Sequence, residues 1–401
     1  MSRPSRAVGY RTVLRLPGVA RVFPAAVLGR LAYAVAPLAL LFTVAQATGS
    51  FAAAGAALGA FGLTSLLMPA KARLLDRFGQ RAVLPVLAAL AGTALVGTAL
   101  AATRATEPGW YVGLAVAVGV PAPPLGPSMR ALWAALAPEP ALRQRAYSLD
   151  GVVEESLYAV GPLLVGAVLA VGSAAAALAL SGVLLVAGSL AMATSPAATR
   201  HGAPARGRVP TRWSGPFRRR GYPLLILTVL GFALASGPLD LAVAARAERA
   251  GHPSAAGYLL AAVAVGSALG GLAWGARRHR RTPWTHLAGL LAASAATLAA
   301  AAAAPTLVVL GGVLVLLGAA AAPVFVVAYL TADELVPAAG RTEATTWVNT
   351  ANNLGLAIGA AGAGAVVDRA GTGLALLAGG LVALATAAGL LSARRRPPST
   401  G

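Results

Sequence analysis

Long apolar segments separated by short polar ones make up almost the whole chain of 401 residues. A helix needs about 20 predominantly apolar residues to cross a bilayer. Twelve segments meet this requirement: 22–46, 51–74, 82–103, 109–133, 149–171, 174–196, 221–245, 254–276, 283–303, 306–330, 343–367 and 371–393. Residues 283–330 contain no Asp, Glu, Lys or Arg, and we divide them at Ala304–Pro305 because one helix of that length would not fit a bilayer. The pattern predicts an all-α integral membrane protein with twelve transmembrane helices.

Composition supports a lipid environment and excludes two soluble classes. The chain is 58% hydrophobic and 11% charged, and its mean hydropathy is +0.74, so a soluble globular protein is not expected. The net charge of +20 by itself suggests nucleic acid. However, the arginines lie between apolar segments and do not form a folded polar surface interleaved with aromatic residues. We therefore expect the lipid bilayer, and not a nucleic acid, as the partner.

The basic residues are distributed unevenly over the predicted loops. Of the 32 Lys and Arg residues, 27 fall on the side that carries both termini. The remaining five are Arg104, Arg246, Arg249 and Arg369 on the other side, and Arg30 within the first helix. Cytoplasmic loops of membrane proteins carry an excess of Lys and Arg. The chain is therefore expected to be a multi-pass protein of the cytoplasmic membrane with both termini in the cytoplasm.

A polar, basic segment with Pro and Gly at 197–220 divides the chain into two halves, 1–196 and 221–401. Faint repetition agrees with this division. The segments that open at Arg145 and Arg341, before helices 5 and 11, are 196 residues apart. The turn after helix 2 has a degenerate counterpart about 199 residues later, after helix 8, if Gly275 matches Asp76. The two similar offsets indicate one duplicated six-helix unit.

The turn between helices 2 and 3 contains the most specific motif of the chain. It reads Ala72-Arg73-Leu74-Leu75-Asp76-Arg77-Phe78-Gly79-Gln80-Arg81. This string resembles the loop Gly-x-x-x-Asp-Arg-x-Gly-Arg-Arg/Lys of the major facilitator superfamily, except that Ala72 and Gln80 replace a Gly and a basic residue. Between helices 2 and 3 of a twelve-span chain with a basic central linker, the motif makes the chain similar to that family over essentially its whole length. The resemblance implies two pseudo-symmetric six-helix halves packed around a midplane site.

The resemblance also implies that this loop is a gate formed by Asp76, Arg77, Gly79 and Arg81. Asp76 would lie near the positive N-terminal end of helix 11 when the cytoplasmic side is closed, and the two arginines would pair with acids of neighbouring loops. The alternative is that the arginines only set the topology and Asp76 is a solvated neighbour.

Charged residues inside spans are costly, so they usually face the bundle interior or a water-filled path. Such candidates are Arg30 in helix 1, Glu154 and Glu155 near the start of helix 5, and Asp240 in helix 7. We expect Arg30 to pair with Glu154 or Glu155, and Asp150 to be interfacial. Each buried glutamate is either a proton acceptor during transport or a static partner of Arg30. Asp240 has no basic partner within its span except Arg246 near the outer end, which makes it a candidate carrier of a proton or cation.

Helix 11 is unusually polar for a membrane span. Asn349, Asn352 and Asn353 have the i, i+3 and i+4 spacing that lines one helical stripe. Such a stripe either holds helices together or hydrogen-bonds a substrate. Candidate aromatic residues of a cavity are Tyr33, Trp133, Tyr158, Phe232 and Tyr329, although each taken singly is better explained by packing or by anchoring at the membrane interface.

Two proline-containing segments bear on the transport mode. Gly161-Pro162 in helix 5 resembles part of a Gly-Pro motif of antiporting efflux members, although Leu157 and Val165 replace two of its glycines. Helix 4 lacks the superfamily's Arg-x-x-Gln-Gly element. It contains instead Pro121, Pro123, Pro124 and Pro127, which predict a kink.

No constellation for catalysis is found. The four histidines have no metal-ligand spacing, there is no cysteine, and no Gly-rich loop ends in Lys-Ser/Thr. We expect neither an enzyme nor a bound cofactor or metal. The sequence favours a monomeric secondary active transporter for proton-coupled efflux of a small organic compound. The alternatives are uptake or facilitated diffusion of a small solute, and a non-transporting membrane sensor with the same fold.

Overall fold

The computed structural model describes residues 10–104, 107–201, 216–275, 281–336 and 341–395. Nearly all of these residues are helical, and the described part contains no β-strand. The elements of the first half are α1 (Tyr10–Leu14), α2 (Val19–Thr48), α3 (Phe51–Leu63), η1 (Thr64–Leu67), α4 (Met68–Phe78), α5 (Gln80–Ala101), η2 (Ala102–Arg104), α6 (Pro108–Gly119), α7 (Leu125–Leu136), α8 (Pro140–Val171), α9 (Ala174–Ala193) and α10 (Pro196–His201). Those of the second half are η3 (Pro216–Arg218), α11 (Tyr222–Ser236), α12 (Pro238–Arg249), α13 (Ala255–Gly275), α14 (Pro283–Ala302), α15 (Leu307–Leu335) and α16 (Arg341–Arg395).

Within the described ranges, nine helices are long and apolar enough to cross a membrane. The last of these, Thr346–Arg394, has 49 residues, and Gly371 divides it by a backbone turn with φ 87°. Two shorter apolar helices, Phe51–Leu67 and Pro108–Gly119, add to these. The predicted all-α membrane fold is confirmed, and the arrangement is compatible with twelve crossings, although that count stays a prediction.

Helix 4 is interrupted and not merely kinked. Helix α6 ends at Gly119 and α7 begins at Leu125, with Pro121, Pro123 and Pro124 in the connector. A proline has no backbone N–H and disfavours helical geometry in the residue before it, so consecutive prolines prevent the helix from continuing. The seventh predicted span is likewise divided, because Pro238 starts α12 directly after Gly237.

The start of α8 differs from the prediction. We expected helix 5 to begin at residue 149, but α8 begins at Pro140, nine residues earlier. Asp150 therefore lies well inside a continuous helix, and only 2% of its side chain is exposed. The expectation that Asp150 is interfacial is wrong for this reason.

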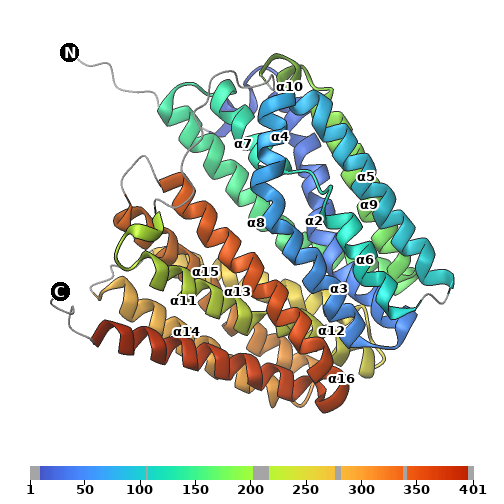
Figure 1. Ribbon diagram of the computed structural model, residues 1–401, viewed down its shortest axis with the longest axis vertical. Helices are drawn as coiled ribbons and strands as arrows, with labels where there is room; N and C mark the ends of the chain where they lie inside the picture. Colours follow the sequence, from blue (N-terminus) through green and yellow to red (C-terminus); the bar gives the residue numbers. More distant parts are fainter. Residues whose placement is uncertain (1–9, 105–106, 202–215, 276–280, 337–340, 396–401) are drawn as a thin grey trace.

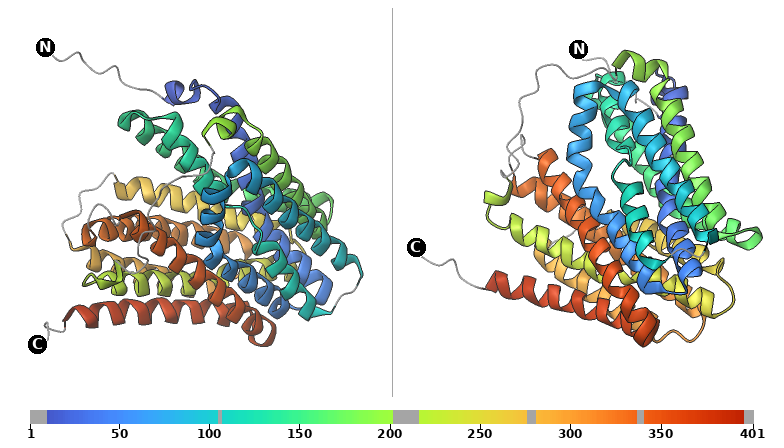
Figure 2. Two further views of the ribbon diagram at one scale, coloured as in Figure 1. Left: turned by 45° about the horizontal axis from the view of Figure 1, so that its top comes forward. Right: turned by 45° about the vertical axis from the view of Figure 1, so that its right-hand side comes forward.

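The helices form two bundles, as Figure 1 and Figure 2 show. Helices α2 to α9 make up the N-terminal bundle, and α11 to α16 make up the C-terminal bundle. The bundles converge at one end, where α3 lies against α12 and α16, and α8 lies against α13. They diverge toward the opposite end, where α10 and η3 lie. We call these the packed end and the terminal end. Most of the predicted linker 197–220 lies outside the described residues, but α10 packs on α7 and α2 of the N-terminal bundle.

Small residues allow the close approach at the packed end. A Cβ atom added to Gly55 of α3 would lie 2.6 Å from the carbonyl oxygen of Ala360 in α16. One added to Gly166 of α8 would lie 2.8 Å from the carbonyl oxygen of Ser254, just before α13. Real side chains do not tolerate such distances to backbone atoms. The two bundles therefore touch backbone to backbone at this end, as is common for helices in membranes.

Candidate functional site

A chain of ion pairs runs through the N-terminal bundle from α2 through α8 to α7. The Nη2 atom of Arg30 donates to Oδ1 of Asp150 at 2.8 Å. Arg130 of α7 lies 3.9 Å from Oδ2 of the same aspartate, and it donates to Oε2 of Glu154 at 2.7 Å. We refer to Arg30, Asp150, Arg130 and Glu154 as the ion-pair chain.

The ion-pair chain passes from the interior to an accessible region. Arg30 and Asp150 are 5% and 2% exposed, whereas Arg130 and Glu154 are 50% and 30% exposed. Breaking a buried ion pair by removing one partner typically costs about 3–5 kcal/mol, whereas an exposed pair contributes roughly 0–1 kcal/mol. Loss of one partner is thus expected to cost more stability at the inner pair than at the outer pair.

The predicted partner of Arg30 was wrong. We expected Glu154 or Glu155, but the structure pairs Arg30 with Asp150 and pairs Glu154 with Arg130. Asp150 and Glu154 share a face of α8 because they are four residues apart, and Asp150 is the one level with Arg30. The Glu155 side chain lies outside the described residues. Arg130, which the sequence analysis treated only as a loop charge, joins the two acids.

The interrupted helix α6–α7 is held by polar side chains of three other helices. Lys71 of α4, the only lysine of the chain, is buried and donates from Nζ to the carbonyl of Gly119 at 3.1 Å. The Tyr33 hydroxyl of α2 donates to the carbonyl of Pro123 at 2.6 Å. Gln80 of α5 donates to the carbonyl of Ser128 at 3.1 Å. The carbonyls of Gly119 and Pro123 also accept from the backbone N–H groups of Ala122 at 3.2 Å and Leu125 at 2.9 Å, so the side chains add second partners at the break.

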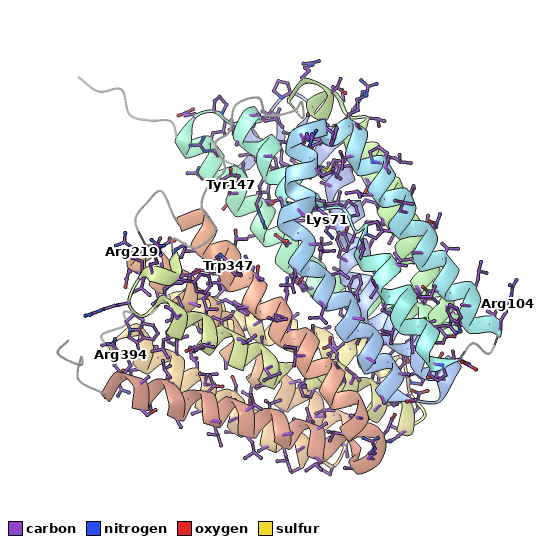
Figure 3. All side chains as sticks on the ribbon, in the orientation of Figure 1. Lys71, Arg104, Tyr147, Arg219, Trp347 and Arg394 are labelled. Carbon is purple, nitrogen blue, oxygen red and sulfur yellow. The ribbon has the colours of Figure 1, made fainter. Side chains whose placement is uncertain are left out.

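These contacts bear on Tyr33, which the sequence analysis offered as a substrate-binding candidate. Its hydroxyl is engaged by the helix break, and so its observed contact is structural. Lys71 was missed because the sequence analysis counted it only as a topological charge. Figure 3 shows Lys71 among the helices of the N-terminal bundle.

Asp240 lies in the first turn of α12 and is exposed, although its neighbours on both sides, 238–239 and 241–245, are all buried. No hydrogen bond or ion pair of Asp240 occurs among the described residues. Arg246 does not reach it, because its two terminal nitrogens donate to the carbonyls of Ala301 and Ala302 at 2.8 Å each. Asp240 is therefore an accessible carboxylate between residues of α12 that are covered by protein.

The C-terminal bundle contains an aromatic and amide cluster. The Tyr329 hydroxyl of α15 donates to Oδ1 of Asn349 in α16 at 2.6 Å. The rings of Phe232, Phe325 and Tyr329 form a continuous series with centroid separations of 5.8 and 6.2 Å. Asn349 and Asn353 are exposed, and Asn352 is half-buried. We call Phe232, Phe325, Tyr329 and Asn349 the aromatic–amide cluster.

The other predicted aromatic residues differ in their surroundings. Trp133 is fully buried and packs on the ring of Phe23 at 5.2 Å, so it belongs to the core. Tyr158 is 60% exposed. Figure 3 shows two further aromatic side chains, Tyr147 and Trp347, on opposite bundles where the bundles diverge.

The predicted gate loop lies at the terminal end of α4 and α5. Gly79 joins the two helices with φ 82°, a conformation that side-chain-bearing residues rarely adopt. Arg77 and Arg81 are exposed, and the Arg77 guanidinium lies 5.2 Å from the ring centroid of Phe78. The side chain of Asp76 lies outside the described residues, so its predicted contact with helix 11 stays a prediction.

The Gly-Pro element of α8 serves a packing role. The backbone of Gly161 lies against Ala34 of α2, and the carbonyl of Pro162 faces Gly257 of α13. Both contacts leave no room for a larger residue at the two glycines. Among the described residues, no group of three or more His, Cys, Asp or Glu side chains is arranged to hold a metal ion.

Comparison with known proteins identifies relatives of the fold. The sequence profile of the Major Facilitator Superfamily matches residues 22–360 and 241–401. No curated protein sequence matches the chain significantly. Among solved structures, the nucleoside transporter NupG is similar with a TM-score of 0.71 and 14% identity, over 95% of this chain and 100% of that one.

Two further solved structures are similar to the same degree. A POT family transporter in complex with 5-aminolevulinic acid has a TM-score of 0.70 and 11% identity, over 96% of this chain and 97% of that one. A bacterial homologue of the human lysosomal transporter Spinster, in an inward-facing and occupied conformation, has a TM-score of 0.70 and 16% identity. The similarity extends over 94% of this chain and 99% of that one. At these identities the similarity establishes the fold.

Proposed function

The chain belongs to the Major Facilitator Superfamily, and on this basis we propose that it is a secondary active transporter that exports a small organic compound in exchange for protons. It is a multi-pass membrane protein with the transporter fold of that superfamily. The further proposals concern its membrane orientation, its coupling ion and its cargo.

The observation that carries the proposal is the unequal contact between the bundles at their two ends. Backbone contacts at Gly55 and Gly166 join them at the packed end, and they diverge toward the terminal end. Alternating access in this superfamily rests on rocking of one half against the other around a central site. A molecule closed at one end and spread at the other fits one extreme of that motion.

We propose that the terminal end faces the cytoplasm. The positive-inside rule supports this orientation, because 27 of the 32 basic residues fall on that side. Arg219 and Arg394 lie at the terminal end, and Arg104 lies at the far extremity of the N-terminal bundle (Figure 3). The described conformation would then be inward-facing in the cytoplasmic membrane.

Proton coupling is proposed to use the exposed end of the ion-pair chain. Protonation of Glu154 removes the charge that holds Arg130 at 2.7 Å. The guanidinium then moves closer to Asp150, whose Oδ2 is already 3.9 Å away, so the positive charge stays paired. Binding of one proton is thereby coupled to a small displacement of α7 relative to α8. No uncompensated charge remains in the membrane.

The cargo is proposed to bind between this chain of charges and the C-terminal bundle. Asp240 and the aromatic–amide cluster offer a carboxylate, an aromatic surface and amide groups there. This combination suits a polar or cationic organic molecule with an apolar part. Two solved structures with this fold, a nucleoside transporter and a POT family transporter in complex with 5-aminolevulinic acid, support a small organic molecule as the cargo.

The test is reconstitution of the purified protein in proteoliposomes, after a thermal-shift screen of metabolites and drugs for a binding compound. We expect accumulation of the bound compound in inside-out vesicles that is driven by a pH gradient and abolished by an ionophore. Flux that does not depend on the pH gradient would indicate facilitated diffusion in place of proton-coupled export. Binding of a compound without any flux would indicate a membrane sensor in place of a transporter.

A further inference from the structure

The packed end contains a contact between the bundles that the sequence analysis did not single out. Asp368 of α16 lies three residues before the turn at Gly371, and it faces the start of α3 in the other bundle. Its Oδ1 accepts from the backbone N–H of Phe51 at 2.9 Å. Its Oδ2 accepts from the backbone N–H of Ala52 and from the Ser50 hydroxyl, both at 2.8 Å.

This contact completes the cap of α3. The first N–H groups of a helix have no partner within the helix and carry a partial positive charge. Ser50 is the N-cap residue, and its hydroxyl oxygen accepts from Ala53 at 3.2 Å. The N–H groups of Phe51 and Ala52 would remain open, and it is the carboxylate of the other bundle that binds them. The start of α3 is therefore fully capped only while the bundles are together at this end.

No basic side chain competes for Asp368 among the described residues within ion-pair distance. Arg249 of α12 donates instead to the carbonyl of Val367 at 3.2 Å, and Arg369, which follows Asp368 on α16, is exposed. Ion pairing therefore does not account for the position of the carboxylate. All three of its observed hydrogen bonds go to the first residues of α3.

The directions of the helices suggest a second contact of the same kind at the terminal end. The segment α3–η1–α4 runs from the packed end to the terminal end, and the first part of α16 runs in the opposite direction. Each segment thus has an aspartate near its C-terminal end, Asp76 on α4 and Asp368 on the first part of α16. Asp368 binds the N-terminal end of α3, whereas α4 ends at the terminal end of the molecule, where the first part of α16 begins. The gate predicted for Asp76 would be the same contact with the roles exchanged.

We infer that Asp368 is the latch of the closed outer end, and that the α3–α4 segment and α16 form reciprocal acid-to-helix latches, of which one is made in each extreme of the transport cycle. The inference rests on the proposed alternating-access function. In the described conformation the Asp368 latch is made, and it releases when the bundles rock apart at the packed end. Because the released carboxylate and N–H groups both become hydrated, the latch opens without leaving a buried unpaired group.

The test measures conformation and not transport, so it is independent of whether a cargo is found. The chain has no cysteine, so introduced cysteines are labelled without background. One spin-labelled pair, Thr103→Cys with Ala303→Cys, spans the packed end, and another, Thr194→Cys with Ser392→Cys, spans the terminal end. Double electron–electron resonance on the protein in lipid nanodiscs gives the population of each distance.

We expect Asp368→Ala to raise the ratio of outward-open to inward-open populations about 5- to 30-fold, the effect of losing a helix cap. The distance across the packed end should lengthen, and the distance across the terminal end should shorten. Ser50→Ala, which removes one of the three bonds, should shift the ratio in the same direction by less. Asp76→Asn should shift it in the opposite direction.

Glu107→Gln is the matched control, because Glu107 is an exposed acid at the same end that makes no side-chain cap contact. Unchanged populations in Asp368→Ala, in a variant that elutes and melts as the parent does, would overturn the latch. A shift of equal size in Glu107→Gln would also overturn it. A population shift in a protein that transports nothing would sustain the latch and remove the proposed transport function.

Discussion

The two bundles hold their polar groups in different ways. The N-terminal bundle binds its intramembrane charges to one another, from Arg30 through Asp150 and Arg130 to Glu154. The C-terminal bundle has a carboxylate, Asp240, without an observed ionic partner in the described part of the chain, and a neutral cluster around Tyr329 and Asn349. Paired charges suit the exchange of a proton between partners, whereas an accessible carboxylate beside aromatic and amide groups suits the binding of a small molecule. On this comparison we propose that the first bundle couples the proton and the second recognises the cargo.

The largest effect is expected from breaking the inner ion pair. Asp150→Asn leaves Arg30 buried without a counter-charge, which should lower the free energy of unfolding by about 3–5 kcal/mol. Thermal unfolding in detergent measures this loss. The double variant Arg30→Met with Asp150→Leu should recover most of the stability, because it removes both charges. If Asp150→Asn alone melts like the parent protein, the inner pair does not stabilise the bundle.

An effect of intermediate size is expected from variants that change how flux responds to a pH gradient, and it should distinguish the two bundles. Glu154→Gln should reduce flux driven by a pH gradient at least about tenfold, to the level without a gradient, and change stability by less than about 1 kcal/mol. Asp240→Asn should instead weaken binding of a cationic compound and leave the dependence on the gradient in place. Flux at graded pH gradients and binding by calorimetry provide the two readouts.

The control for this comparison is Glu139→Gln, an exposed acid at the start of the same helix α8 that makes no cap contact. It should behave as the parent does in both assays. If Asp240→Asn, and not Glu154→Gln, abolishes the response to the gradient, the assignment of coupling and recognition to the two bundles is reversed.

The smallest effect is expected from the aromatic–amide cluster. Tyr329→Phe removes one hydrogen bond of 2.6 Å and keeps the ring, so binding should weaken by about 0.5–1.5 kcal/mol, or roughly 2- to 12-fold. Thr297→Val, at a half-buried position of α14 whose hydroxyl bonds only its own helix, serves as a control with a similar loss of one hydroxyl. Equal affinities of Tyr329→Phe and the parent protein would exclude the Tyr329 hydroxyl from recognition.

The sequence was sufficient for the class of fold, because hydropathy alone limits a chain of this kind to membrane-spanning helices. It also identified Arg30 and Glu154 as residues of interest, since charges in spans are rare for energetic reasons. It did not give their partners. The partner of Arg30 depends on where α8 begins, and a start at Pro140 in place of residue 149 moved Asp150 from the interface into the interior.

Other features of the candidate site required the spatial arrangement. Lys71 and Tyr33 act on carbonyls exposed by the break between α6 and α7, and the prolines of helix 4 predicted only a kink there. Asp368 lies close to the predicted loop between two spans, where a charged residue is ordinary by sequence. Its role depends on which helix of the other bundle comes to that end, and a linear pattern contains no such information.

Lys71 has a practical consequence for chemical labelling. Since it is the only lysine of the chain, amine-directed reagents have one side-chain target, and that target is buried with its Nζ atom bound to the carbonyl of Gly119. Acylation of Lys71, counted by mass spectrometry against the α-amino group of the same molecule, therefore reports each opening of the α6–α7 break. The exposure of the break in helix 4 can thus be followed on the natural sequence, without an introduced residue.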